Sequence, residues 1–345
     1  MNTVAAFEIK YRQFLDPEGK LVDDKAPPLA RDFEQLISLY ELMTLTRVFD
    51  AKAITLQRTG KLGTYASSLG HEAIHVGIGS AMAEEDIFAP MYREYGAMFY
   101  RGVKPAEILA YWGGDERGSD FSGPAHDFPI CVPIATQCLH AAGAAFAVKL
   151  RGEERVAVTI VGDGGSSKGD FLEALNAAGA FKLPAVFVIA NNQWAISVPR
   201  SKQSGATTLA QKGIAAGLPS VQVDGNDLLA VRWAMEMALK RARSGQGASV
   251  IEMMTYRLSD HTTADDARRY RSADEVEAAQ AKEPLIRLRR YLMDQEAWDD
   301  AKEDALVERC KEQTDAAVQT YLDSEPQPVT SMFDSMFAEL PDELQ

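Results

Sequence analysis

One carboxylate lies within the glycine-rich turn Val161-Gly162-Asp163-Gly164-Gly165-Ser166-Ser167-Lys168-Gly169. The turn does not match the two common phosphate-binding loops. A dinucleotide fingerprint needs a third glycine where Ser167 stands, and a P-loop needs Ser or Thr where Gly169 stands. At a helix N-terminus, a bare carboxylate would repel a phosphate unless a cation lay between them. Mg²⁺ fills that role because it joins one or two carboxylates to a diphosphate, so Asp163 is a candidate magnesium ligand.

A second oxygen ligand should come from the end of the neighbouring strand. Asn191 and Asn192 directly follow the apolar run 185–190, and Asn192 lies 192 − 163 = 29 residues after Asp163. A strand–helix–strand unit has roughly 30 residues and places both side chains at the carboxyl ends of adjacent parallel strands. Two tight turns would explain either motif alone, but the pair at this spacing favours a metal–diphosphate site.

Alternating strands and helices position these motifs. Short apolar runs predict buried strands, and amphipathic segments predict helices. The predicted strands are 155–161, 185–190, 221–223 and 249–256, and the predicted helices are 169–181, 208–216 and 227–243, the last capped by Asn226. Such alternation is typical of an α/β fold with a doubly wound, mostly parallel sheet and helices on both faces.

Further helices flank this unit. Helical spacing predicts a helix at 33–58 that begins at the N-cap Asp32, and others at 70–83, 273–292 and 304–322. Residues 113–133 are rich in Gly, Pro and Asp and predict a long functional loop. We therefore expect an extended N-terminal arm (1–32), a binding domain for the diphosphate side of a cofactor (33–272) and a C-terminal helical region packed on it (273–345).

The composition narrows the functional classes. The chain of 345 residues has 36 Lys plus Arg against 50 Asp plus Glu, a net charge of −14. This field would repel nucleic acid and anionic membranes, so neither is expected as a main partner. The three cysteines form neither a disulfide framework nor a zinc-ligand pattern. The start has no leader pattern, and no apolar run reaches about 18 residues, so a cytoplasmic protein is expected.

Several ordered motifs resemble one protein family. Gly162-Asp163-Gly164 followed by Asn192 resembles the thiamine diphosphate motif, and the segment GDGGSSKGDFLEALNAAGAFKLPAVFVIANNQWAIS around it is similar to the alpha subunit of the E1 component of 2-oxo acid dehydrogenase complexes. Further matches are PMYREYG at 90–96, VPIATQ at 132–137, VDGND at 223–227 and TYRLSDHTTADDARRYRS at 255–272. The resemblance runs from about residue 11 to residue 340, which is nearly the whole chain.

The resemblance implies a set of cofactor ligands. Asp163 and Asn192 would bind Mg²⁺ through their side chains, and Trp194 would bind it through its backbone carbonyl. Backbone N–H groups of Gly164 and Gly165 would meet the diphosphate at the helix N-terminus. The side chains of Tyr92 and Arg93 would hold the diphosphate as well, since arginine suits a forked contact with phosphate.

The VPIATQ segment is implied to hold the other end of the thiamine cofactor. Backbone groups near Val132 would contact the aminopyrimidine, and Ile134 would lie beneath the bent cofactor. Branched-chain members also place a potassium ion here, and the matching residues are Cys131, Pro133, Thr136 and Gln137. Cys131 replaces the usual serine, and a thiol is a poor ligand for potassium.

The segment 257–272 contains a histidine whose importance only the resemblance indicates. From residue types alone this is a solvated, charged loop. The family carries an active-site histidine at His261, in a loop that orders over the cofactor, with Arg257 and Asp265 bracing it. A histidine there could donate to phosphate or move a proton near neutral pH. Thr262 stands where animal homologues carry a regulatory phosphoserine.

Three other histidines have weaker implications. His71 stands where the family usually has Gln or Glu, and His75 and His140 are predicted to pack in the interior.

The function implied is that of an E1 alpha subunit. It would catalyse thiamine diphosphate-dependent oxidative decarboxylation of a 2-oxo acid and reductive acylation of the lipoyl group of E2. Segments 162–196 and 209–225 are closer to pyruvate enzymes, and the loop around His261 is closer to branched-chain (2-oxoisovalerate) enzymes; pyruvate is favoured. An E1 beta subunit would complete the site in an α₂β₂ heterotetramer. The arm at 1–30 and the apolar face of the helix at 33–58 are the expected contact surfaces.

Other functions fit the same motifs. One is another two-chain thiamine enzyme, such as acetoin dehydrogenase or a split transketolase. Another is a non-enzymatic module that binds Mg²⁺ and a diphosphate and uses the acidic helices after residue 273 as an interaction surface. Substrate tests would separate the enzymes from one another, and cofactor binding without turnover would indicate the module.

Overall fold

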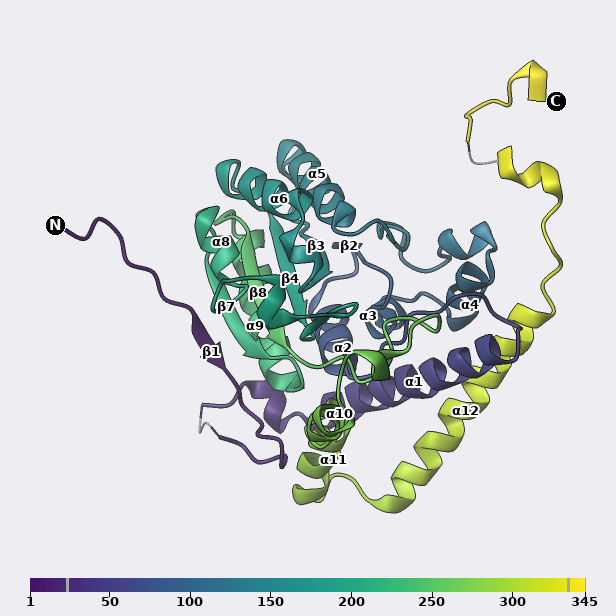
Figure 1. Ribbon diagram of the computed structural model, residues 1–345, viewed down its shortest axis with the longest axis horizontal. Coiled ribbons are helices and arrows are strands. Elements are labelled where there is room, and N and C mark those ends of the chain that lie inside the picture. Colours follow the sequence, from purple (N-terminus) through teal and green to yellow (C-terminus); the bar gives the residue numbers. More distant parts are fainter. Residues whose placement is uncertain (23–24, 334–335, 345) are drawn as a thin grey trace.

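A parallel sheet forms the centre of the protein in the computed structural model, which describes residues 1–22, 25–333 and 336–344. Within these residues the sheet has six strands in the order β1-β7-β8-β4-β3-β2, and each neighbouring pair is parallel (Figure 1). The strands are β1 (Lys10–Arg12), β2 (Ile87–Ala89), β3 (Ala157–Gly162), β4 (Ala185–Asn191), β7 (Ser220–Asp224) and β8 (Ser249–Met254). A small antiparallel pair joins β5 (Trp194–Ala195) to β6 (Val198–Pro199). The predicted α/β fold with a mostly parallel sheet is confirmed.

Helices cover both faces of the sheet. They are α1 (Phe33–Arg58), α2 (Glu72–Ala81), α3 (Tyr95–Tyr100), α4 (Pro105–Gly113), α5 (Thr136–Arg151), α6 (Gly169–Ala180), α7 (Arg200–Gln203), α8 (Gln211–Ala215), α9 (Leu228–Arg243), α10 (Ala273–Gln280), α11 (Pro284–Asp294) and α12 (Asp300–Leu322). Successive residues of β4 serve opposite cores. Val186 and Val188 belong to the core that contains α2 and α9, and Phe187 and Ile189 to the core that contains α5 and α6. This two-sided burial explains why the strand is apolar throughout.

The helix α1 begins where its cap predicts, but its apolar face lies inside the fold. Asp32 caps it by accepting from the Gln35 N–H at 3.1 Å. The helices α11 and α12 lie beside α1 (Figure 1). The apolar side chains of α1 are buried or half-buried in the core that these helices share with it, and the ring of Tyr40 lies 5.6 Å from the ring of Trp298. The prediction that this face contacts a partner is therefore wrong, because the C-terminal helices of the same chain already cover it.

Several boundaries differ from the predicted ones. The helix predicted at 273–292 is two helices, because Pro284 starts α11 and Glu283 caps it through the Ile286 N–H. Asp227, not Asn226, caps α9 by accepting from the Leu229 N–H at 3.0 Å. The strand β2 and the helices α3, α4 and α5 were not predicted. The loop predicted at 113–133 is irregular apart from one 3₁₀ turn at Glu116–Ser119.

The N-terminal segment is only partly an arm. Residues 1–9 form no strand or helix and are almost all exposed, and the segment projects from the body (Figure 1). The next three residues pair with β7 as the edge strand β1. The backbone N–H groups of Phe14 and Leu15 then donate to Asp227 at 2.6 and 2.9 Å. The division at 32 and 272 stays a prediction. Among the described residues, no helix is both long and apolar enough to cross a membrane.

Candidate cofactor and metal site

The sheet brings the two sequence motifs together. Strands β3 and β4 are parallel neighbours, and Gly162 pairs in register with Ala190. The next residues along each strand therefore emerge at the same edge. Asp163 is 1% exposed and Asn192 is 6% exposed, so both side chains are enclosed at the carboxyl end of the sheet, where open α/β sheets bind ligands.

Oxygen atoms converge between these side chains. One end atom of the Asn192 amide lies 3.2 Å from Asp163 Oδ1 and 3.1 Å from the Trp194 carbonyl oxygen, and the other end atom lies 3.0 Å from His71 Nε2. If nitrogen faces Asp163, the amide donates to both oxygens. If oxygen faces Asp163, three oxygens meet and only a cation makes the arrangement stable. Octahedral Mg²⁺ holds its ligands at about 2.0–2.1 Å, which spaces adjacent oxygens about 3 Å apart, so the cluster fits this ion.

The Asp163 carboxylate has an unused oxygen. Its Oδ2 is buried and has no hydrogen-bond partner within the described part of the chain. Burial raises the pKa of Asp163 to about 6, and its own N–H, Arg257 and the Gly164 N–H partly offset that rise. No group of three or more His, Cys, Asp or Glu that could hold a metal occurs among the described residues. A metal here would therefore take one carboxylate with amide and carbonyl oxygens, a set that suits Mg²⁺ better than softer metals.

The glycines next to Asp163 are required by space. A Cβ on Gly164 would lie 2.6 Å from the Ala195 side chain, and one on Gly165 would lie 2.5 Å from Val161 and 3.1 Å from Ile134. Gly165 opens a single 3₁₀ turn, and the helix α6 begins only at residue 169. The expectation that both glycines lie at the helix N-terminus is thus corrected: they lie in the turn that precedes it.

Two buried arginines face this edge without a carboxylate partner. Arg93 is 2% exposed and Arg257 is fully buried. Arg93 donates to the backbone carbonyls of Ser67 and His261. Arg257 donates to the carbonyls of Trp194 at 3.0 Å and Ile196 at 2.9 Å. No ion pair of either residue occurs in the described structure, so their charges stay available to an anion.

Arg257 corrects one expectation about its loop. The segment 257–272 was predicted to be solvated, but Arg257 and Ala267 are buried. Asp265 accepts from the His261 N–H at 2.9 Å, and Tyr270 accepts from Arg257 at 2.8 Å. The loop is therefore held by internal hydrogen bonds. Residue types alone do not reveal this, because charged residues are ordinarily exposed.

His261 lies between the two arginines. Its Nδ1 is 3.4 Å from Arg93 and 3.5 Å from Arg257, and its ring meets the ring of Tyr92 edge-on with the centroids 6.1 Å apart. Burial, Arg93 and Arg257 lower the pKa of His261 to about 3. The ring is therefore neutral near pH 7 and can act as a hydrogen-bond donor or acceptor. Tyr92, Arg93 and His261 form one contact group.

Val132 and Ile134 lie at the rim of the site. They are 48% and 37% exposed, and Ile134 leans on Gly165. The Cys131 N–H donates to the Met91 carbonyl at 2.9 Å, which joins this segment to the one carrying Tyr92.

At the start of α5, one observation favours the predicted potassium site and another speaks against it. Gln137 has a buried Oε1 without a partner within the described residues, as a cation ligand would. However, the Pro133 carbonyl already accepts from the Cys131 thiol at 3.5 Å. The potassium ion stays a prediction.

Sequence reasoning missed two polar groups near the glycine turn. Lys212 donates to the Ser166 carbonyl at 2.6 Å, and burial followed by Arg200 lowers its pKa to about 8. His71 contacts Asn192 although the two are 121 residues apart. No sequence signal marks either contact, because each depends on how distant segments pack.

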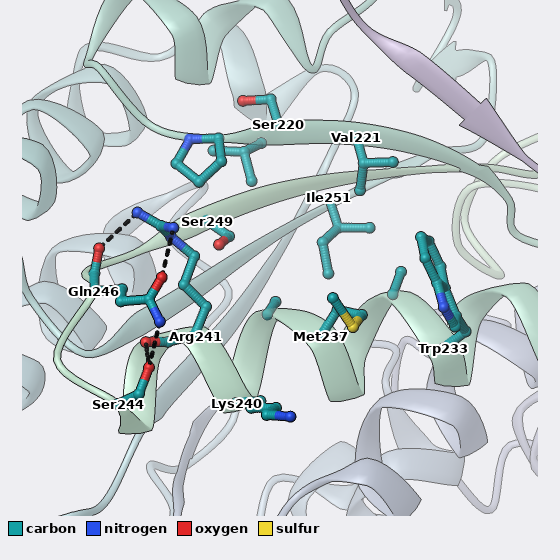
Figure 2. A pocket seen from close by; sticks show the side chains of 14 residues that line it. Ser220, Val221, Trp233, Met237, Lys240, Arg241, Ser244, Gln246, Ser249 and Ile251 are labelled. Carbon is teal, nitrogen blue, oxygen red and sulfur yellow. Dashed lines mark hydrogen bonds between the residues drawn. The ribbon is translucent and has the colours of Figure 1, made fainter.

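A separate apolar groove lies at the opposite end of the sheet. It has a volume of about 460 Å³ and is bounded by the first residues of β7 and β8 and by α9 from Trp233 onward (Figure 2). Val221, Ile251 and Met237 line it. Arg241 at its rim donates to the Gln246 carbonyl at 2.6 Å. None of the predicted site residues lines this groove.

Comparison with known proteins gives the family. The model of the "Dehydrogenase E1 component" family matches residues 40–330. The chain is 42% identical over 344 residues to the pyruvate dehydrogenase E1 component subunit alpha of Staphylococcus aureus strain Mu50, covering 99% of this chain and 92% of that protein. It is 43% identical, with the same coverage, to the protein of that name from Staphylococcus epidermidis. The chain therefore belongs to the dehydrogenase E1 component family.

Proposed function

We propose that this chain is the alpha subunit of a pyruvate dehydrogenase E1 component that binds thiamine diphosphate through Mg²⁺. One observation carries the proposal: the oxygens of Asp163, Asn192 and Trp194 converge at the sheet edge that also holds Arg93 and Arg257 without carboxylate partners. A divalent cation and a diphosphate together complement this arrangement, since the oxygens need a cation and the arginines need an anion.

The proposed roles follow from position. Asp163, Asn192 and the Trp194 carbonyl would hold Mg²⁺. The N–H groups of Gly164 and Gly165 would meet the diphosphate, since a glycine-rich turn can present successive N–H groups to an anion. Arg93, whose guanidinium lies over the Tyr92 ring at 5.2 Å, would contact the diphosphate as well. Val132 and Ile134 would then contact the far end of the cofactor.

Thiamine diphosphate, when bound, supplies the carbanion chemistry that protein side chains lack. The chain's part is to orient the cofactor and control protons. Neutral His261 can donate a hydrogen bond or pass a proton without first losing its own positive charge. Arg257 and Asp265 hold the loop that carries it. His261 is the residue we assign to catalysis.

A beta subunit is proposed to complete the site. Val132 and Ile134 are exposed at its rim, and α5 continues this surface with a stripe at helical spacing. The stripe consists of Leu139, Gly143, Phe146 and Leu150. A helix interior glycine costs about 1 kcal/mol relative to alanine, and the space beside Gly143 is open. Close approach of a partner helix would account for it. This stripe replaces the face of α1 as our proposed contact.

The substrate and the acceptor are also proposals. The relatives' name favours pyruvate over 2-oxoisovalerate. The acyl group would pass to the lipoyl group of an E2 acyltransferase in the same complex.

Dye reduction by the co-purified alpha and beta chains tests this function. With Mg²⁺ and thiamine diphosphate, pyruvate should support turnover at a higher kcat/KM than 2-oxoisovalerate or acetoin. The alpha chain alone should show no turnover. Turnover by this chain alone would contradict the shared site. Cofactor binding without turnover of any 2-oxo acid, with the beta chain present, would favour a binding module.

A further inference from the structure

His71 contacts the Asn192 amide at the end that does not face Asp163. Its Nε2 lies 3.0 Å from that end atom. The histidine precedes the first residue of α2 and is 1% exposed, so water does not compete for the contact. A neutral imidazole carries one proton, so Nε2 either donates to the amide oxygen or accepts from the amide nitrogen.

Two arrangements are self-consistent at this contact. In the first, Nε2 accepts from the Asn192 nitrogen, and the amide oxygen faces Asp163 Oδ1 at 3.2 Å and the Trp194 carbonyl at 3.1 Å while accepting from the Trp194 N–H at 3.3 Å. In the second, protonated Nε2 donates to the amide oxygen, and the amide nitrogen donates to the two facing oxygens. The first arrangement brings three oxygens together and needs a cation. The second needs no cation, but the Trp194 N–H then faces the amide nitrogen and loses its acceptor.

The ring of His71 has no second hydrogen bond that fixes its tautomer among the described residues, although backbone groups of Ser68 and Leu69 favour a proton on the ring. Its Nδ1 has no hydrogen-bond partner within the described residues. The ring of His75 stacks on the ring of His71, with the centroids 5.7 Å apart and an 18° angle between the planes. The two ring nitrogens of His75 also lack hydrogen-bond partners within the described residues. Histidines near metal sites usually have one tautomer fixed by a partner on the other nitrogen. Here the backbone groups of Ser68 and Leu69 act on the ring, and the Asn192 contact is its one hydrogen bond among the described residues.

We propose that His71 is a positioning residue that sets the orientation of the Asn192 amide, and that a divalent cation bound between Asp163, Asn192 and the Trp194 carbonyl selects the Nδ1-protonated tautomer of His71. This inference rests on the metal site of the proposed function. His71 acts through Asn192 and contacts neither the cation nor the substrate. Without its acceptor nitrogen, the Asn192 amide nitrogen turns toward Asp163 and competes with the cation.

Mn²⁺ binding tests the positioning role without reference to activity. The alpha–beta complex is titrated with Mn²⁺ at saturating thiamine diphosphate, and free Mn²⁺ is measured by electron paramagnetic resonance. His71→Leu should raise the Mn²⁺ dissociation constant about 10- to 100-fold, the usual cost of losing a partner of a metal ligand. His71→Gln restores an acceptor and should bind close to wild type. His75→Leu is the matched control, since it removes an equally buried ring that does not contact Asn192, and it should leave binding unchanged.

Two results would overturn the role of His71. One is wild-type affinity in His71→Leu, and the other is an equal loss in His71→Gln and His75→Leu, which would indicate a purely structural effect. Asp163→Ala separates a failure of the proposed metal site from a failure of the proposed role of His71. If it abolishes Mn²⁺ binding while His71→Leu does not, this inference alone fails. If it binds Mn²⁺ like wild type, the metal site itself fails.

The tautomer is visible to nitrogen NMR. Solid-state ¹⁵N spectra of the sedimented complex, with ¹⁵N-histidine in this chain, identify the His71 signals by their loss in His71→Gln. Adding Mg²⁺ and thiamine diphosphate should move Nε2 of His71 from the protonated to the unprotonated chemical-shift range. The same tautomer before and after addition would overturn the proposed selection.

Discussion

Arg287 and the pair Arg93 and Arg257 are buried to the same degree but are held in different ways. Arg287 is 2% exposed and donates to Asp224 at 2.6 Å and to the Leu15 carbonyl at 3.0 Å. It joins α11 to the edge of the sheet and to the N-terminal segment. Arg93 and Arg257 donate to backbone carbonyls and, in Arg257, to a tyrosine hydroxyl, with no carboxylate within ion-pair distance among the described residues.

The difference separates a structural arginine from a binding one. A buried charge is costly unless a partner compensates it. Asp224 compensates Arg287 inside the fold. Among the described residues, Arg93 and Arg257 have no carboxylate within ion-pair distance, and the nearby carboxyl groups act on them only from farther away. A bound anion is therefore the partner that would complete them. Buried charges without an ion-pair partner therefore indicate the binding site better than the presence of a groove does. The apolar groove of Figure 2 lies at the other end of the sheet, away from the predicted site residues.

The strongest effect on stability is expected at Arg287. Arg287→Leu leaves Asp224 buried without its partner, so the free energy of unfolding should fall by about 3–5 kcal/mol. Urea unfolding of the purified chain measures it. Arg309→Leu is the control, because Arg309 pairs with Glu41 on the surface and should change stability by less than about 1 kcal/mol. A similarly small loss of stability in Arg287→Leu would contradict the structural role of Arg287.

Arg93 should affect binding instead of stability. Arg93→Met removes a charge that lacks a carboxylate partner, so the free energy of unfolding should change little. Hydrogen bonds to charged groups contribute about 1.5–3 kcal/mol, so the dissociation constant of thiamine diphosphate should rise about 10- to 100-fold by titration calorimetry with Mg²⁺. Arg268→Met removes an exposed charge from the neighbouring loop and should bind normally. A large stability loss with unchanged cofactor affinity at Arg93 would contradict its assignment.

The ring of His261, which lies between Arg93 and Arg257, should make the stability of the chain depend on pH. Its pKa is lowered to about 3, against about 6.5 in the unfolded chain. The unfolded state therefore takes up a proton as pH falls below about 6.5 while the folded state does not, so stability should fall with pH. Between pH 6.5 and 5, wild type should lose about 1–2 kcal/mol more than His261→Gln does. Equal slopes in wild type and His261→Gln would show that burial and the two arginines together do not lower the pKa of this ring.

The sequence predicted the parts of the fold that depend on local pattern. The apolar runs of β3 and β4 and the spacing from Asp163 to Asn192 were sufficient to place the two side chains at one edge. The helix α5 was missed because its alanine-rich face gives weak periodicity. The cap of α9 was assigned one residue early because Asn226 and Asp227 are both good caps.

The remaining features of the site depend on contacts between distant segments. Arg257 looks like a surface residue in the sequence, yet the loop folds it against the carbonyls of Trp194 and Ile196. The contact of His71 with Asn192 joins the start of α2 to the end of β4. Pattern and propensity carry no information on such pairs, so only the packed structure reveals which buried charges lack a partner.

The smallest effect is expected in the groove at the other end of the sheet. Met237 is 56% exposed beside it, so Met237→Ser should change the free energy of unfolding by less than about 0.5 kcal/mol. Affinity for thiamine diphosphate and turnover with the beta chain should match wild type. A loss of cofactor affinity in this variant would show that the groove, too, contributes to binding.

The location of the metal tests the central claim most directly. Crystals of the alpha–beta complex grown with Mn²⁺ and thiamine diphosphate would reveal the metal by its anomalous scattering. We expect one strong peak at the carboxyl edge of β3 and β4, where Asp163, Asn192 and the Trp194 carbonyl would bind the metal. The diphosphate should lie on the other side of the metal, in contact with Arg93. A peak elsewhere, or an Asn192 amide nitrogen still facing Asp163 with the cofactor bound, would contradict the account.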